Sequence, residues 1–458
     1  MSSPAGPAQP GRTPVPPPHA APPTGPDAPA GYRAVFAVPE FRAVFAAHLL
    51  ASLGVVVCEL ALSVLVFRLT GSPLLSALTF ALGLLPYLVG GTLLSAVADR
   101  YPARRVLVVC DLLCALAAAG MMLPGVPVAA LLGLRCVIAA IAPVFAGTRA
   151  ATLGEVLGEG DLFVLGRSVI RIVNQSAQLA GFAAAGLLLA AVTPHAVLAV
   201  TAGTFLGSAL LLRLGTRVRP ARRAARGALL RASLSGARHL LADRRIRALL
   251  LLCWLPPTCV VVPEALLVAY AGTLGVGPAG LGLLMCSMPI GAVVAETLVG
   301  SFLGPVARER LTFPMGLCAV LPSLGFAARP PLGWAVLLLV LTGTGISYNF
   351  GVDRWFVAAV PDVLLGQAMT VMQAGRMTIM GLGMGLAGAA AEFVPLRVVM
   401  PAGGAIGVLG VLAVIVEVRR TGGDVPGAVA PHGPCLEPGH GPCPEPERGP
   451  SPDREPES

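Results

Sequence analysis

Among the ionisable side chains that stand within long apolar stretches of the sequence, four are candidates for proton coupling. These residues are Glu59, Asp111, Arg135 and Glu264, and their neighbours are mostly Ala, Leu, Val and Cys. Charged groups are costly in such surroundings and usually serve a function there. A carboxylate in a low-dielectric cavity can take up and release a proton near neutral pH. We therefore predict that these four residues couple proton movement; the alternative is that they only hold helices together through hydrogen bonds.

Polar side chains also recur at helical spacing within the apolar stretches. Four of them lie between residues 171 and 178 at positions i, i+3, i+4 and i+7, so they share one face of a helix. Lipid contact would leave such groups without hydrogen bonds, which favours a cavity or another helix as their surroundings. The residues that we expect to line a substrate cavity are His48, Ser52, Arg171, Asn174, Gln175, Gln178, Gln373 and Arg376.

The composition predicts that membrane-spanning helices hold these residues in place. Of the 458 residues, 55% are hydrophobic and 12% are charged, whereas a soluble protein carries about 25% charged residues. The apolar residues gather in blocks of about 20, the length that a helix needs to cross the hydrocarbon core. We predict an all-α polytopic membrane protein with twelve transmembrane helices in two pseudo-symmetric six-helix bundles. The expected helices are residues 41–67, 74–98, 106–123, 128–147, 167–192, 196–214, 248–272, 279–303, 311–328, 334–350, 367–393 and 398–418, with a mixed segment at 149–166.

The basic residues indicate how the chain is oriented. All 32 of them are arginine, which excludes both a phosphate-binding loop with its lysine and a Schiff-base lysine. The arginines cluster at the ends of the apolar blocks, so topology explains the net charge of +9 better than nucleic-acid binding does. Their bias predicts that both termini are cytoplasmic, in an inner or plasma membrane. We expect no disulfide framework, no metal site and no nucleic-acid partner.

Matching residues suggest that the chain contains a duplicated unit. Glu59 and Glu264 occupy corresponding places in the first helix of each bundle, 205 residues apart, and Pro86 and Pro289 correspond in the second helices with an offset of 203 residues. A nearly constant offset favours two related six-helix halves. The five expected parts are a disordered cytoplasmic tail (1–38), an N-terminal six-helix half (39–214), an arginine-rich cytoplasmic linker (215–247), a C-terminal six-helix half (248–420) and a second disordered cytoplasmic tail (421–458).

A short charged turn joins the second and third expected helices. Residues 99–105 read Asp-Arg-Tyr-Pro-Ala-Arg-Arg, and turns this basic lie on the cytoplasmic side of membrane proteins. The turn resembles the signature Gly-x-x-x-Asp-Arg-x-Gly-Arg-Arg of the major facilitator superfamily, from which it departs at Ser95, Pro102 and Ala103. Together with the twelve expected helices, it makes the chain similar to the multidrug, macrolide and siderophore exporters of that superfamily, which are proton antiporters.

The resemblance implies roles for individual residues. The carboxylate of the turn and the arginines after it would form a gate that faces the N-terminal end of the helix at 367–393; the alternative is an anchor that only fixes topology. Arg135 resembles the lone arginine of a family motif linked to proton transfer. The expected gate residues are Asp99, Arg100, Arg104 and Arg105.

The resemblance also implies what the chain does. It predicts a secondary active transporter, not an enzyme, that exports small amphipathic molecules in exchange for protons by alternating access. The expected partners are a small-molecule substrate, protons and membrane lipids, the transport cycle needs no cofactor, and we expect a monomer. The alternatives are a uniporter or importer of a small nutrient and a non-transporting membrane sensor or scaffold.

Overall fold

The chain folds into helices, as its composition predicts. The computed structural model describes residues 32–86, 101–157, 161–217, 241–361 and 364–421, and within them no strand occurs. Eight helical spans in these ranges are long and apolar enough to cross a membrane. The all-α membrane fold is therefore confirmed, while the count of twelve crossings stays a prediction. The helices are α1 (Tyr32–Ala37), α2 (Pro39–Thr70), α3 (Pro73–Leu84), α6 (Ala103–Met121), α7 (Val128–Leu157), α8 (Asp161–Ala191), α9 (Pro194–Gly215), α11 (Arg244–Leu274), α12 (Pro278–Phe302), α13 (Pro305–Val320), η2 (Leu321–Ala328), α14 (Leu332–Gly345), η3 (Ile346–Tyr348), α15 (Asn349–Ala359), α16 (Leu365–Phe393) and α17 (Leu396–Thr421).

Small polar residues and glycines set where the helices begin and end. Ser72 and Thr193 cap α3 and α9 by accepting hydrogen bonds from backbone N–H groups, and a proline follows each of them. Asp243 caps α11 in the same way. Gly71 and Gly275 end α2 and α11 with φ angles of 66° and 65°, a conformation that favours glycine. The dipeptide Gly71–Ser72 is thus the whole connection between α2 and α3.

The structure corrects the expected end of the fourth helix. The helix expected at 128–147 continues as α7 to Leu157, and α8 begins at Asp161, so most of the expected mixed segment at 149–166 is helical. Leu153 and Leu157 are buried in an apolar cluster with residues of α1, α2 and α8. Burial of these leucines stabilises the extra turns, although the polar composition of the segment favours a loop.

Two later segments, each expected to be one continuous helix, change their helical geometry part-way. The segment expected at 311–328 is α13 followed by the 3-10 helix η2. The helix expected at 334–350 consists of α14, η3 and α15 and continues to Ala359. Close to this change, a Cβ on Gly345 would lie 2.2 Å from the Ala319 backbone N. Apolar composition does not show such local changes in helical hydrogen bonding, because they depend on packing between helices.

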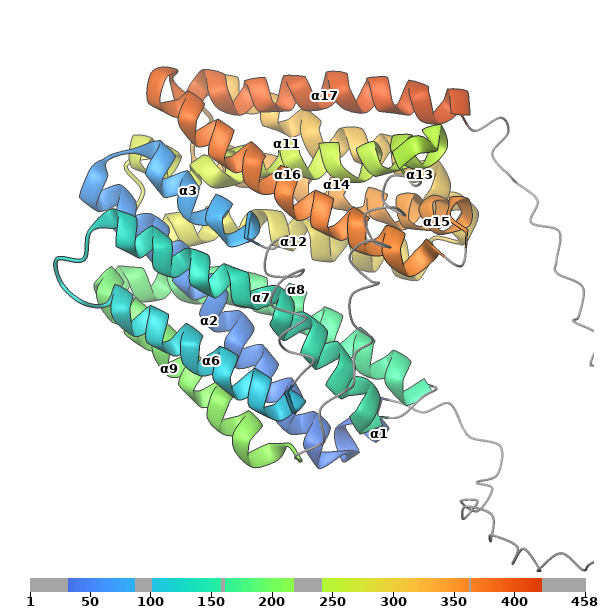
Figure 1. Cartoon of the computed structure of the whole chain (residues 1–458). Coiled ribbons are helices and arrows are strands. Elements are labelled where there is room, and N and C mark those ends of the chain that lie inside the picture. Colours follow the sequence, from blue (N-terminus) through green and yellow to red (C-terminus); the bar gives the residue numbers. More distant parts are fainter. Residues whose placement is uncertain (1–31, 87–100, 158–160, 218–240, 362–363, 422–458) are drawn as a thin grey trace, which may run out of the picture.

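The helices form two halves that meet at one end of the molecule and diverge towards the other (Figure 1). Helices α1 to α9 make the first half and α11 to α17 the second; α8 packs against α12, and α3 packs against α16. A Cβ on Gly186 of α8 would lie only 2.6 Å from the Gly282 Cα of α12. Gly381 and Gly388 of α16 lie equally close to α3. We call the end with the Gly71–Ser72 turn the closed end, and the end where α6 begins and α9 finishes the diverging end.

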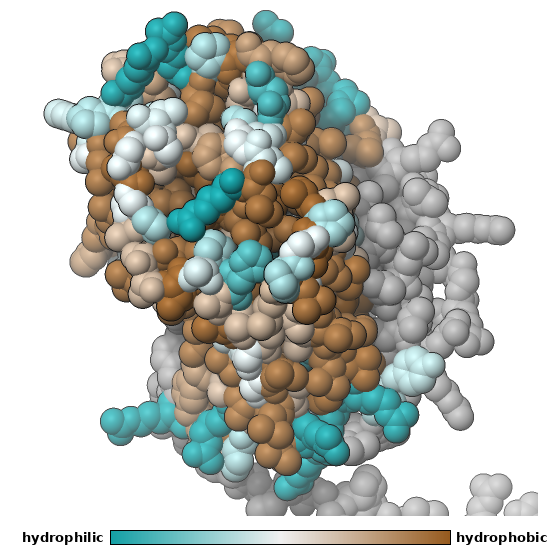
Figure 2. All heavy atoms as spheres, turned by 90° about the vertical axis from the view of Figure 1, so that its left-hand side faces the viewer, coloured by the Kyte–Doolittle hydropathy of each residue, from teal (hydrophilic) through white to brown (hydrophobic). Residues whose placement is uncertain are grey.

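Large apolar side chains lie on the outside of both halves. Leu116, Leu214, Phe302 and Leu409 are each more than half exposed. Figure 2 views the closed end and shows apolar residues over much of it, with hydrophilic residues near the upper and lower margins and in a short band across the middle. The exposed apolar side chains on the outside of the helices suit contact with lipid acyl chains, whereas in water they would form large exposed apolar patches.

Candidate functional site

A buried ion pair ties three helices of the first half together. Arg135 Nη2 of α7 lies 2.8 Å from Glu59 Oε1 of α2, and the two side chains are 3% and 19% exposed. Arg135 Nε also donates a hydrogen bond of 3.3 Å to the Thr79 carbonyl of α3. A planar guanidinium with several fixed donors can serve both acceptors at once. Two of the four predicted proton-coupling residues are therefore direct partners.

Gly83 of α3 leaves the space that this ion pair occupies. A Cβ at this position would lie 2.2 Å from Arg135 Nη2 and 3.0 Å from Glu59 Oε1, whereas atoms in normal contact lie about 3.5–4.0 Å apart. A larger residue would have to displace one of the two charged groups. The sequence gives no signal for this role, because a glycine in an apolar helix is usually explained by close helix packing.

Glu264 of α11 brings a second carboxylate to this cluster from the other half. Its side chain is half-buried and interacts electrostatically with Glu59. Within the described part of the chain, Glu264 makes no hydrogen bond or ion pair. The cluster of Glu59, Arg135 and Glu264 therefore carries one net negative charge when all three groups are ionised, and a single proton makes it neutral.

Asp111 of α6, the fourth predicted proton-coupling residue, lies in a separate buried cluster. Asp111 Oδ2 and Ser208 Oγ of α9 are 2.6 Å apart, and Ser208 Oγ lies 3.0 Å from the Ala47 carbonyl of α2. The Ser208 hydroxyl is the donor in both contacts, so its one hydrogen is shared between the Asp111 carboxylate and the Ala47 carbonyl. Asp111 Oδ1 has no partner among the described residues. Asp111 therefore ties α6 to α9 and α2 through Ser208, and it also interacts electrostatically with Arg149 of α7.

Three of the predicted cavity residues meet in a third polar cluster, between α2, α7 and α8. His48 Nδ1 contacts Arg149 Nη1 and lies 3.2 Å from Ser52 Oγ. A side-chain hydrogen bond links His48 with Asn174. The Arg149 guanidinium lies 4.8 Å from the centroid of the Phe145 ring, a cation–π contact that stabilises its position.

Arg149 is a site residue that the sequence prediction did not single out, since it stands at the start of the expected mixed segment at 149–166. The extension of α7 carries it into the bundle. Arg149 follows Arg135 by 14 residues, about four helical turns, so the two share roughly one face of α7. That spacing is the signal by which Arg149 could be recognised.

The remaining cavity candidates are less closely grouped. Arg376 Nη2 of α16 donates a hydrogen bond of 2.7 Å to Gln373 Oε1, and Arg376 Nε is buried without a partner among the described residues. Gln178 is half-buried on α8. Arg171 and Gln175 also belong to α8, but their side chains lie outside what the structure describes. Among the described residues, no group of three His, Cys, Asp or Glu could hold a metal ion.

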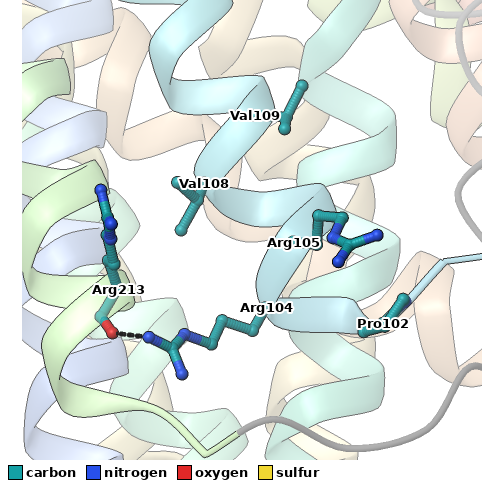
Figure 3. Close-up of a pocket in the computed structure, with 6 residues that line it drawn as sticks. All are labelled: Pro102, Arg104, Arg105, Val108, Val109 and Arg213. Carbon is teal, nitrogen blue, oxygen red and sulfur yellow. Dashed lines mark hydrogen bonds between the residues drawn. The ribbon is translucent and has the colours of Figure 1, made fainter.

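The expected gate is described only in part. Asp99 and Arg100 lie outside the described residues. Arg104 donates a hydrogen bond to the Arg213 carbonyl at the end of α9 (Figure 3), and Arg105 is exposed. In this conformation Arg104 thus contacts a helix of its own half and not α16. The gate at the diverging end stays a prediction.

At the closed end, a carboxylate from one half caps a helix of the other. Glu392 Oε1, near the end of α16, accepts a hydrogen bond from the Ser72 hydroxyl and one of 3.1 Å from the Leu74 N–H. Both donors stand at the start of α3, where the helix dipole favours a negative group. This contact links the two halves across 320 residues of sequence.

The chain shows clear similarity to known transporters in sequence and fold. The sequence profile of the Major Facilitator Superfamily matches residues 44–353, more than half of the chain. The chain belongs to the major facilitator superfamily. No curated protein matches it in sequence. The predicted resemblance is thus confirmed for the superfamily, and this member is a multi-pass membrane transporter.

Several solved structures share the fold of this major facilitator. The nucleoside transporter NupG matches with a TM-score of 0.66 at 16% identity, over 83% of this chain and 99% of that chain. A POT family transporter in complex with a thioalcohol-conjugated peptide gives 0.62 at 11%, over 83% and 96%. A structure titled for substrate recognition in proton-dependent oligopeptide transporters gives 0.60 at 14%, over 84% and 99%. At these identities the similarity shows the fold alone.

Proposed function

We propose that this transporter exports small amphipathic molecules from the cytoplasm in exchange for protons. The cluster of Glu59, Arg135 and Glu264 carries the proposal, because both halves contribute to it and one proton neutralises it. Glu264 interacts electrostatically with Glu59, so the charge on one carboxylate affects protonation of the other. We expect the protein to act as a monomer in an inner or plasma membrane.

Coupling follows from the fact that the two carboxylates belong to different halves. Glu59 stands on α2 and Glu264 on α11, so rocking of the halves changes their separation. A shorter separation raises the repulsion between two ionised carboxylates, and a proton on either one removes it. Proton binding therefore favours one orientation of the halves, and by linkage that orientation favours proton binding.

The described conformation suits a cytoplasm-facing state. The arginine distribution favours a cytoplasmic location for the diverging end. At the closed end, Glu392 with the start of α3 and the Gly186–Gly282 crossing hold the halves together. These contacts must break for the outward-facing state, while the turn at 99–105 would then approach α16. Rigid-body movement between packed halves is an established way to switch such proteins.

The substrate class is inferred from side chains near the line where the halves meet. His48, Arg149 and Asn174 provide polar groups on one side. Met380 of α16, which is half-buried, provides adaptable apolar surface on the other, and methionine suits binding of varied apolar ligands. Import of a small polar nutrient is the second candidate, since the similar structures include nucleoside and peptide transporters.

Gradient-driven flux in proteoliposomes tests the proposal. The full chain is reconstituted, a pH gradient is imposed, and movement of a fluorescent amphipathic cation is followed in each direction. We expect flux that requires the gradient and falls at least about tenfold in Glu59→Gln. The matched control is Glu417→Gln, a surface carboxylate that pairs with Arg244. Flux of equal size with and without the gradient would contradict proton coupling, and no flux from folded protein would favour a sensor or scaffold.

A further inference from the structure

A cavity lies between the beginning of α6 and the end of α9, on the outer side of the first half. Its volume is about 390 Å³, and it is lined by Pro102, Arg104, Arg105, Val108, Val109 and Arg213. The two helices run antiparallel here, so the cavity is at the diverging end of the molecule (Figures 1 and 3). It lies apart from the cluster of Glu59, Arg135 and Glu264, and two of its lining residues, Arg104 and Arg105, are also expected gate residues.

The cavity is strongly cationic. Three arginines and no carboxylate line it. Arg104 reaches across it to the Arg213 carbonyl (Figure 3). Within the described part of the chain, neither Arg105 nor the Arg213 side chain forms an ion pair. At this end of α9, Glu40 accepts a hydrogen bond from the Arg217 N–H.

The first turn of α6 adds to this positive character. Its N-cap residue is Pro102, which makes no side-chain hydrogen bond to the free N–H groups of the helix. These N–H groups and the helix dipole favour an anion. Guanidinium groups bind phosphate oxygens well because two parallel N–H donors match two oxygens.

Apolar surface continues from the cavity along both helices. Val108 and Val109 lie one turn from the arginines towards the middle of the bundle. Beyond them, Leu116 of α6 and Leu210 of α9 are 69% and 56% exposed. A ligand that satisfies both regions has an anionic head and long apolar chains.

We infer that this cavity binds the headgroup of an anionic phospholipid of the cytoplasmic leaflet. Its headgroup occupies the cavity that Arg104, Arg105 and Arg213 line, and its acyl chains follow the exposed leucines. Juxtamembrane arginines attract anionic lipids, and the antiparallel pair of helices provides two of them at one depth. The bound lipid stabilises the contact between α6 and α9 next to the turn at 99–105.

Lipid binding to the full-length protein, measured by native mass spectrometry, tests the inference. Detergent-purified protein is titrated with phosphatidylglycerol, phosphatidylcholine or inorganic phosphate. We expect one tightly held phosphatidylglycerol, at least about tenfold weaker binding of phosphatidylcholine, and no displacement by millimolar phosphate. Equal retention of both lipids, or displacement by phosphate, would overturn the assignment to an anionic lipid.

Variants locate the site. Arg105→Gln with Arg213→Gln should weaken phosphatidylglycerol binding at least about tenfold, and Arg105→Lys with Arg213→Lys should restore most of it. Arg245→Gln is the matched control, because Arg245 is an exposed arginine at the same end of the other half. The lysine variant keeps the charge and therefore also shows that the cavity folds. Wild-type lipid binding in the glutamine variant would overturn the proposal.

Discussion

Replacing Gly83 by alanine should separate Glu59 from Arg135. The new Cβ would lie 2.2 Å from Arg135 Nη2 and 3.0 Å from Glu59 Oε1, so it would press on both charged groups at once. A normal contact needs about 3.5 Å, and the guanidinium must therefore move by roughly 1 Å or more. The end of an arginine side chain moves more easily than a packed helix does, so the ion pair should lengthen before the helices shift.

The burial of the pair sets the size of the effect. Overpacking costs about 1–3 kcal/mol, and removal of one partner from a buried ion pair costs about 3–5 kcal/mol. Arg135 keeps its hydrogen bond to the Thr79 carbonyl, so we expect a cost of about 2 kcal/mol. Because about 1.4 kcal/mol changes an equilibrium tenfold, gradient-driven transport should fall by at least about tenfold.

Gly133→Ala is the matched control for this substitution. Gly133 lies on α7, and a Cβ there would meet nothing within 4 Å. Alanine raises the helix propensity by about 1 kcal/mol at both positions, so the difference between the variants isolates the clash. Transport driven by a pH gradient is compared at equal amounts of folded protein. Equal transport by Gly83→Ala and Gly133→Ala would refute the role of Gly83.

Three further substitutions test other contacts. Glu392→Ala should shift the equilibrium towards opening of the closed end about fivefold, since an exposed charged contact contributes about 1 kcal/mol. Distances between spin labels on α3 and α16 measure this shift, and an unchanged distance distribution would contradict the prediction. Asp111→Asn should keep the wild-type melting temperature because the amide oxygen can still accept the hydrogen bond from the serine of α9, whereas Asp111→Ala should lower it; equal melting temperatures would exclude this hydrogen bond. Gly291→Ala places a Cβ 2.0 Å from the Val340 carbonyl, a backbone atom that cannot move alone, so the yield of folded protein should fall strongly. Gly385→Ala, with nothing within 4 Å, is its control, and equal yields on size-exclusion chromatography would show that the crossing tolerates a methyl group.

The sequence predicts which side chains matter more readily than it predicts their partners. Glu59, Arg135 and Glu264 stand out because each is a charge in an apolar stretch. The pairing of Glu59 with Arg135 joins residues 76 positions apart, and it depends on how α2 packs against α7. Gly83 illustrates the same limit, since the space it leaves exists only after three helices have assembled.

Helix positions are predictable from apolar blocks, but their ends depend on tertiary packing. Arg149 looks like the end of a membrane span because arginine usually stands at the interface. The buried Leu153 and Leu157 nevertheless extend α7, and Arg149 then lies against His48. The contact of Glu392 with the start of α3 at the closed end could not be predicted from the sequence either, because it forms only when the two halves pack together.

Proton movement caused by substrate tests the coupling mechanism most directly. The full chain is reconstituted in liposomes that contain a pH-sensitive dye, and an amphipathic cation gradient is imposed without a pH gradient. The wild-type protein should move protons in the direction opposite to the cation, and Glu59→Gln should abolish proton movement while Glu417→Gln leaves it unchanged. Cation flux without proton movement in the wild type, or full proton movement in Glu59→Gln, would contradict the role of the Glu59, Arg135 and Glu264 cluster.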